Sequence, residues 1–145
     1  MEANVTFSVL TERQEGPIGD DWKYWIEAKV FNHGLKGQGT IRVAKHVLPS
    51  GVTREPPGPP APVQIPAGDY QNQLKVKLNL EVTEVDLFKN DVGKTSIELM
   101  LDCPEPGEEP RVYDKEISVG VVASPSVAGE TSIFTLNVRL VVSCG

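Results

Sequence analysis

Cysteine, histidine, clustered basic residues and long apolar runs are all scarce in this chain. Its 145 residues include two cysteines and two histidines, and 20 acidic residues outnumber 14 basic ones to give a net charge of -6. Two cysteines without a CxxC spacing argue against a disulfide scaffold and the common zinc motifs. Without clusters of Lys and Arg we expect no nucleic-acid partner. No run approaches the roughly 20 apolar residues of a membrane-spanning helix, so we expect no transmembrane segment.

Catalytic motifs are missing as well. His33 lies in a glycine-containing turn and His46 in a strand pattern, and neither belongs to a known metal or nucleophile motif. Pairs of carboxylates alone are weak support for a glycosidase. We therefore expect a protein that binds and does not catalyse.

Length and composition favour one soluble domain, residues 1–145. This length is typical of a single folding unit, and 39% hydrophobic with 23% charged residues is ordinary for a globular protein. The first residues lack a basic segment followed by an apolar one, so we expect no secretory signal and, by default, a cytoplasmic protein.

Alternating apolar and polar residues predict an all-β protein. The clearest example runs from Leu74 to Val82, where every second residue is apolar, as in a strand with one buried face. Short strands separated by Gly, Pro and Asn turns predict a single antiparallel eight-stranded β-sandwich. The expected strands are Asn4–Glu12, Trp22–Phe31, Thr40–Leu48, Val63–Pro66, Leu74–Val85, Thr95–Asp102, Val112–Ala123 and Thr131–Ser143.

Two segments are too rich in proline for regular strands. The Pro-rich loop at residues 55–62 favours an extended polyproline conformation. It is either a stiff connection from one sheet to the other or a ligand for an aromatic-lined groove. The acidic loop at residues 104–110 is expected to be a solvated hairpin loop, and we also expect a loop from Ala123 to Glu130.

The cysteines and aromatic residues can be placed by strand parity. Cys103 and Cys144 lie on inward positions, which predicts buried free thiols, with a disulfide as the alternative. Trp22 and Tyr24 share the inward face, whereas Trp25 points the other way. Trp25 either packs against a loop or is exposed to a sugar, a lipid interface or a protein partner.

Acidic residues gather where the strand from Leu74 ends. Glu84 and Asp86 continue the buried parity and lie roughly 7 Å apart on one face. An unpaired carboxylate is costly to bury, so we expect both to emerge at the end of the sheet. Asp91 follows in an expected turn at residues 89–93, which brings a third carboxylate close to them.

The segment DLFKNDVGKTSIEL, from Asp86 to Leu99, resembles the third calcium-binding loop of C2 domains. That pattern is Asp-x-Asp, a hydrophobic pair, Lys-Asn/Asp-Asp, a hydrophobic residue, Gly-Lys and a strand. Glu84 stands for the first Asp, Asp86 for the second and Asp91 for the last, with one spacer residue fewer than in the family. The resemblance covers the twenty residues Leu80–Leu99. A loop holding Asp20 and Asp21 is its companion.

This resemblance implies a C2-like sandwich, with an immunoglobulin-like one as the alternative, and calcium as the cofactor. Calcium takes six to eight oxygen ligands and readily uses carboxylates from separate loops. The acids could equally be ordinary turn residues. The implied partner is a membrane or protein surface, and the oligomeric state stays open. Two alternatives remain, a metal-independent protein-interaction or structural subunit and a carbohydrate-binding sandwich. The candidate ligands are Glu15, Asp20, Asp21, Glu84, Asp86 and Asp91.

Overall fold

A computed structural model describes residues 2–87, 89–123 and 130–145, and this part of the chain folds into nine β-strands. No helix in it is long and apolar enough to cross a membrane. The strands are β1 (Glu2–Glu15), β2 (Asp21–Phe31), β3 (Leu35–Val47), β4 (Thr53–Arg54), β5 (Val63–Asp69), β6 (Gln73–Val85), β7 (Asn90–Asp102), β8 (Arg111–Val122) and β9 (Thr131–Cys144).

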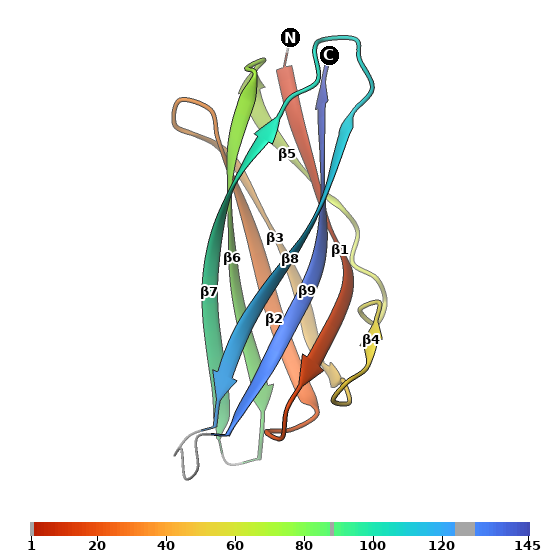
Figure 1. Cartoon of the computed structure of the whole chain (residues 1–145), viewed down its shortest axis with the longest axis vertical. Helices are drawn as coiled ribbons and strands as arrows, with labels where there is room; N and C mark the ends of the chain where they lie inside the picture. Colours follow the sequence, from red (N-terminus) through yellow and green to blue (C-terminus); the bar gives the residue numbers. More distant parts are fainter. Residues whose placement is uncertain (1, 88, 124–129) are drawn as a thin grey trace.

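The strands form two antiparallel sheets packed face to face. One sheet has the order β4-β1-β9-β8, with β5 also paired to β1, and the other has the order β3-β2-β6-β7. Figure 1 shows an elongated sandwich with both termini at one end. The predicted all-β antiparallel sandwich is confirmed. All eight expected strands are present, and the additional strand, β4, has only two residues.

Inward-facing apolar side chains fill the space between the sheets as one core. Leu74, Val76, Leu78 and Val82 are completely buried on β6, as their alternation predicts. The Phe134 ring from β9 lies 5.4 Å from that of Trp22 and 5.2 Å from that of Tyr24, between centroids. These three aromatic residues join the two sheets, because β9 belongs to one and β2 to the other.

A β-bulge changes which residues of β1 face inward. The register of β1 against β9 shifts between Val9 and Thr11. Inward positions before the shift hold apolar residues such as Phe7, whereas the inward positions after it hold Glu12 and Gln14, both completely buried. One extra residue reverses the parity of the rest of the strand, so this bulge carries polar side chains into the interior.

Two loop predictions are wrong in their topology. The Pro-rich loop at residues 55–62 leaves β4 and enters β5, which both pair with β1, so it returns to the sheet it came from. Its residues Pro57, Gly58 and Pro60 lie beside β3 of the other sheet, where they line a hollow. The acidic loop at residues 104–110 joins β7 to β8 in different sheets and therefore does not close a hairpin. Most of the loop expected at Ala123–Glu130 lies outside the described residues.

Both cysteines are free and buried, as predicted from their parity. Cys103 follows β7 with 6% of its surface exposed, and Cys144 ends β9 with 8% exposed. Burial raises the pKa of the Cys103 thiol. The alternative of a disulfide is wrong for this structure.

Glycine allows the edge strands β7 and β8 to approach each other. A Cβ atom at Gly93 of β7 would lie 2.7 Å from the carbonyl oxygen of Gly120 and 2.8 Å from Cγ2 of Val121 on β8. Such distances are shorter than non-bonded contacts allow, so a side chain at residue 93 would push the two edges apart. At Gly120 the nearest atom to an added Cβ would be 3.6 Å away, an ordinary contact.

We predict that Gly93→Ala destabilises the protein by about 1–3 kcal/mol through overpacking between β7 and β8. Gly120→Ala is the matched control on the neighbouring edge and should change stability by less than about 0.5 kcal/mol, because the added methyl group meets no close atom. Urea unfolding of both variants measures the difference. Equal effects would contradict the close approach of the edges at residue 93.

Candidate functional site

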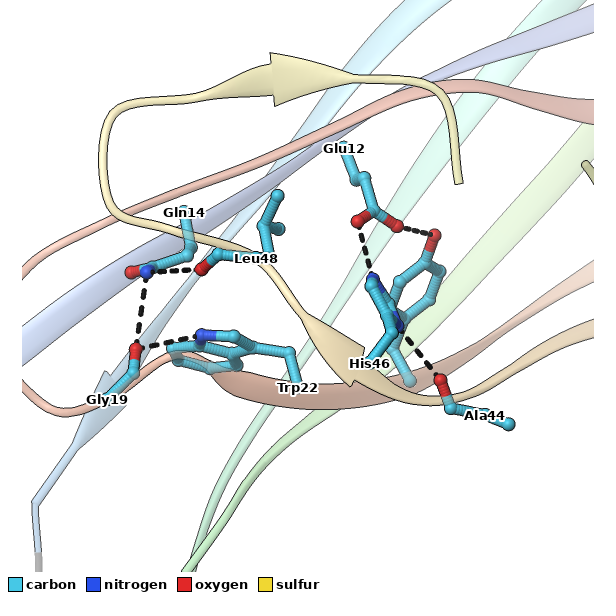
Figure 2. A network of polar contacts seen from close by, with 8 residues as sticks. Glu12, Gln14, Gly19, Trp22, Ala44, His46 and Leu48 are labelled. Carbon is cyan, nitrogen blue, oxygen red and sulfur yellow. Dashed lines mark hydrogen bonds and ion pairs between the residues drawn. The ribbon is translucent and has the colours of Figure 1, made fainter. Parts of the chain in front are cut away.

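The β1–β2 connection is held in place by hydrogen bonds to the sandwich. The Gly19 carbonyl oxygen accepts one bond from the Gln14 side-chain amide at 3.2 Å and one from the Trp22 indole at 3.0 Å. Figure 2 shows these bonds. The backbone N–H of Ile18 donates to the Ser132 hydroxyl at 3.2 Å. The buried Gln14, which the bulge turns inward, therefore positions the loop that carries Asp20.

The β6–β7 hairpin places two of the predicted acids opposite each other. Glu84 on β6 pairs in register with Asp91 on β7, and the ladder continues to the pair Val85–Asn90. Asp91 therefore lies inside a strand, and the expected turn at residues 89–93 is wrong at its C-terminal part. The reason is register: because the hairpin stays paired up to Asn90, the turn must close before that residue.

Glu84 is buried instead of emerging into solvent. The prediction that both acids leave the end of the sheet holds for the exposed Asp86 but is wrong for Glu84, which is only 4% exposed. The backbone of Gly19 covers its carboxylate so closely that a Cβ atom at residue 19 would overlap Oε1 of Glu84. The Gly19 φ of +151° also disfavours other residues. Oε2 of Glu84 is buried and has no hydrogen-bond partner.

Four of the predicted ligand residues converge around the buried carboxylate of the fifth, Glu84. Burial, followed by the negative charges of the four other acids, raises the pKa of Glu84 to about 7. Asp91 is buried with it, Asp21 is half-buried, and Asp20 and Asp86 are exposed. The sixth candidate, Glu15, pairs with Arg13 instead. The acids whose charges act on Glu84 are Asp86, Asp91, Asp21 and Asp20.

Four of these acids, Asp20, Asp21, Glu84 and Asp86, border an open cleft. The strand ends and loops that carry them lie at the end of the sandwich opposite the termini (Figure 1). The cleft has a volume of about 650 Å³, and Lys45 and Leu87 line it together with these four acids. Leu87 is 92% exposed. In their present positions, the described side chains form no group of three or more His, Cys, Asp or Glu that would hold a metal ion.

A buried carboxylate with a free oxygen can be satisfied in two ways. A proton neutralises it, which agrees with the raised pKa of Glu84. A cation bound in the cleft would do the same and would also offset the mutual repulsion of the surrounding carboxylates. Oxygen ligands of this kind suit hard cations such as calcium. The carboxylates present are therefore ligands of the chemical type that binds calcium. Oε2 of Glu84 is the buried oxygen that lacks a hydrogen-bond partner.

A second polar site, which sequence reasoning missed, lies in the interior between β1, β2 and β3 (Figure 2). The fully buried Glu12 carboxylate accepts a hydrogen bond from the Tyr24 hydroxyl at 2.8 Å. Its other oxygen lies 2.5 Å from Nε2 of His46, whose Nδ1 lies 2.8 Å from the Ala44 carbonyl oxygen. Both ring nitrogens thus face acceptors, so a doubly protonated ring satisfies both and pairs its charge with Glu12. Burial, followed by the charge of Glu12, raises the pKa of Tyr24.

Sequence alternation could not reveal this network. Counting from Phe7 and Val9, the inward parity continues to Thr11, which leaves Glu12 outside. The bulge of β1 reverses that assignment, and nothing in the sequence marks its position. His46 is predicted only as a strand residue, because its partner is distant in the sequence.

No protein-family model matches this chain, and a search of curated proteins finds no match either. The C2 resemblance of the segment after Glu84 therefore stays a prediction.

We predict unequal losses of stability when the partners of Glu12 are removed. Tyr24→Phe removes one hydrogen bond and should cost about 1–2 kcal/mol. His46→Leu leaves a buried carboxylate without its charged partner and should cost about 3–5 kcal/mol. Adding Glu12→Gln to His46→Leu should recover part of that loss, because no buried charge remains. Urea unfolding measures all three, and no recovery in the double variant would refute a charged pair.

We also predict that Glu84 makes the calcium-free protein less stable as the pH rises. The native state keeps a proton on Glu84 up to a pKa of about 7, whereas the unfolded chain releases it near 4.5. Stability from this group is present below pH 4.5 and is lost between 4.5 and 7, by at most about 3 kcal/mol. Glu84→Gln should remove this loss, so its stability advantage over the parent grows with pH.

The control is Asp69→Asn, which removes one negative charge from an exposed position that pairs in register with Glu2. The N-terminus lies at the opposite end of the sandwich from the acidic loops (Figure 1). Urea midpoints from pH 4.5 to 8, with a chelator present, compare the three proteins. A constant difference between the parent and Glu84→Gln across this range would show that Glu84 does not hold a proton in the native state.

Proposed function

We propose that this protein is a non-catalytic binding module of C2-like type that takes up calcium at its acidic end and docks there on an anionic membrane surface. The observation that carries the proposal is the Glu84 carboxylate, which is buried, has one oxygen without a partner, and is surrounded by four further acids. Such a group destabilises a core, because its burial costs desolvation free energy and Oε2 gains no hydrogen bond in return.

Calcium is the cation that suits this arrangement best. It accepts irregular sets of six to eight oxygen ligands, whereas magnesium demands a near-ideal octahedron. Glu84 and Asp91 would supply ligands from rigid strand positions, and Asp20, Asp21 and Asp86 from the ends of strands and from loops. The exposed side chains of Asp20 and Asp86 would have to turn toward the ion, because the present positions do not form a ligand set.

Membrane docking follows from charge and from one exposed apolar side chain. A protein with a net charge of -6 is repelled by anionic lipids unless a cation neutralises the contacting end. Leu87 borders the acidic cleft and is 92% exposed, so it is placed to enter a lipid interface once calcium has drawn this end onto the surface. Calcium would thus switch the binding on by reversing local electrostatics.

The rival function is a metal-independent interaction or structural subunit. It has less specific support, because within the described residues it has no single feature comparable to the buried Glu84 carboxylate behind it. A negative calcium result would favour this rival.

We predict that calcium at 1–5 mM raises the melting temperature, because it binds the native state and not the unfolded chain. The shift should be larger at pH 8 than at pH 6, since a proton competes for Glu84 below its pKa of about 7. The double variant Asp86→Asn, Asp91→Asn should lose the shift, whereas the Asp69→Asn control should keep it. No shift of the parent at 5 mM calcium and pH 8 would refute calcium binding.

The docking step is tested with the same proteins on vesicles of phosphatidylserine and phosphatidylcholine. The parent should co-sediment with the vesicles in calcium and stay in solution in a chelator, and Leu87→Ser should bind more weakly while keeping its calcium-induced melting shift. Calcium binding without co-sedimentation would leave the metal site standing and refute the membrane as its partner.

A further inference from the structure

Trp25 forms an aromatic platform on the outer face of the β3-β2-β6-β7 sheet. It is half-buried, and its indole N–H donates a hydrogen bond of 2.8 Å to Oε2 of Glu81 on the neighbouring strand. The other Glu81 oxygen pairs with Lys94 Nζ at 3.2 Å. These contacts fix the orientation of the indole, so its exposed part is a preformed surface and not a freely rotating side chain.

The platform belongs to a polar row that crosses the whole sheet. Trp25 on β2 pairs in register with Arg42 on β3 and with Glu81 on β6, and Glu81 pairs with Lys94 on β7. Side chains in register on the same face are neighbours. Trp25 therefore has Arg42 as its cross-strand neighbour on one side and Glu81, whose carboxylate is paired with Lys94, on the other.

Two hollows adjoin the Trp25 indole, one on each side of it along the strand direction. The larger has a volume of about 540 Å³ and is lined by Lys23, Arg42, Thr83 and Asn90 around Trp25. The smaller has a volume of about 200 Å³ and reaches Lys94. The larger is within the size range of small-molecule sites, and it combines an aromatic wall with a few polar groups, as such sites do.

The side chains that line these hollows carry a net positive charge, whereas the whole protein carries a net negative charge. Lys23, Arg42 and Lys94 face one carboxylate, Glu81, although the whole chain carries a net charge of -6. Within the described residues, neither Lys23 nor Arg42 forms an ion pair. Two cationic donors beside the platform are thus available to an anionic ligand.

We propose that this groove binds an acidic oligosaccharide, with the face of a sugar ring stacked on Trp25 and a uronate carboxylate held by Arg42 and Lys23. An indole offers an apolar face to the C–H face of a sugar ring. A guanidinium matches a carboxylate with two parallel hydrogen bonds. Thr83 and Asn90 would pair with ring hydroxyl groups. A purely apolar ligand would leave these polar groups unpaired, and a cationic one would meet Arg42 and Lys23.

This site is separate from the acidic end, because Trp25 and its neighbours lie on the outer face of the sheet whereas Glu84 and Asp91 lie on the inner face. All measurements are therefore made in a chelator, and their outcome is independent of calcium binding. The chelator also prevents calcium from cross-linking the acidic sugars.

The test is quenching of tryptophan fluorescence by acrylamide, a neutral quencher. Trp22 is completely buried, so the accessible signal comes from Trp25. Oligomers of galacturonate, of mannuronate and of hyaluronan are the probes, and maltotriose is the neutral control. We expect at least one uronate oligomer to protect Trp25 in a saturable way at millimolar concentration, with affinity at least tenfold lower in 0.5 M than in 0.05 M sodium chloride. No protection by any uronate probe, or equal protection by maltotriose, would overturn the proposal.

Matched charge variants locate the site, with affinity measured by calorimetry. Lys23→Gln with Arg42→Gln should weaken binding at least tenfold. Lys29→Gln with Lys77→Gln removes the same charge from the same sheet face, outside both hollows, and should change affinity less than twofold. Trp25→Ala should abolish binding, with its melting curve showing that it is folded. Equal weakening by the two charge pairs would overturn the proposed groove by showing non-specific attraction.

Discussion

The structure depends on a carboxylate placed where neither solvent nor a hydrogen bond can fully satisfy it. Glu84 lies under the backbone of Gly19, with Asp91 opposite it on the next strand. Burial and four neighbouring negative charges raise its pKa to about 7. A group in this position is stabilised by either a proton or a cation, so the acidic end is sensitive both to pH and to cations. The proposed calcium-dependent docking depends on calcium taking the place of the proton at Glu84.

Other polar contacts of the fold hold this acidic end of the sandwich in place. The bulge of β1 turns Gln14 inward, and Gln14 holds the loop whose Gly19 covers Glu84. The same bulge buries Glu12, which joins β1 to His46 of the other sheet. The bulge of β1 thus turns two polar side chains inward. One of them, Glu12, pairs with His46, and the other, Gln14, holds the loop whose Gly19 covers Glu84. Figure 2 shows the two sets of contacts side by side.

The sequence predicts those parts of the structure that depend on alternation within a strand. The two sheets, the inward cysteines and the buried Trp22 and Tyr24 are predicted because a period of two is visible without knowing any partner. The burial of Glu84, the strand position of Asp91 and the inward Glu12 are not predicted. They depend on register between strands and on a bulge, which are properties of pairs of segments far apart in the chain. The row through Trp25 and Arg42 is invisible for the same reason.

The convergence of the acids on one end was predicted from the C2 resemblance, which makes the loop of Asp20 and Asp21 the companion of the segment after Glu84, but its electrostatic consequence was not predicted. The most direct test of the account is a carbon-13 NMR titration of the Glu84 side-chain carboxyl, with Glu84→Gln to assign the signal. Without calcium it should titrate near pH 7, and with 5 mM calcium its pKa should fall below the ordinary value of 4.5. A pKa near 4.5 without calcium, or one near 7 that calcium does not move, would contradict the account.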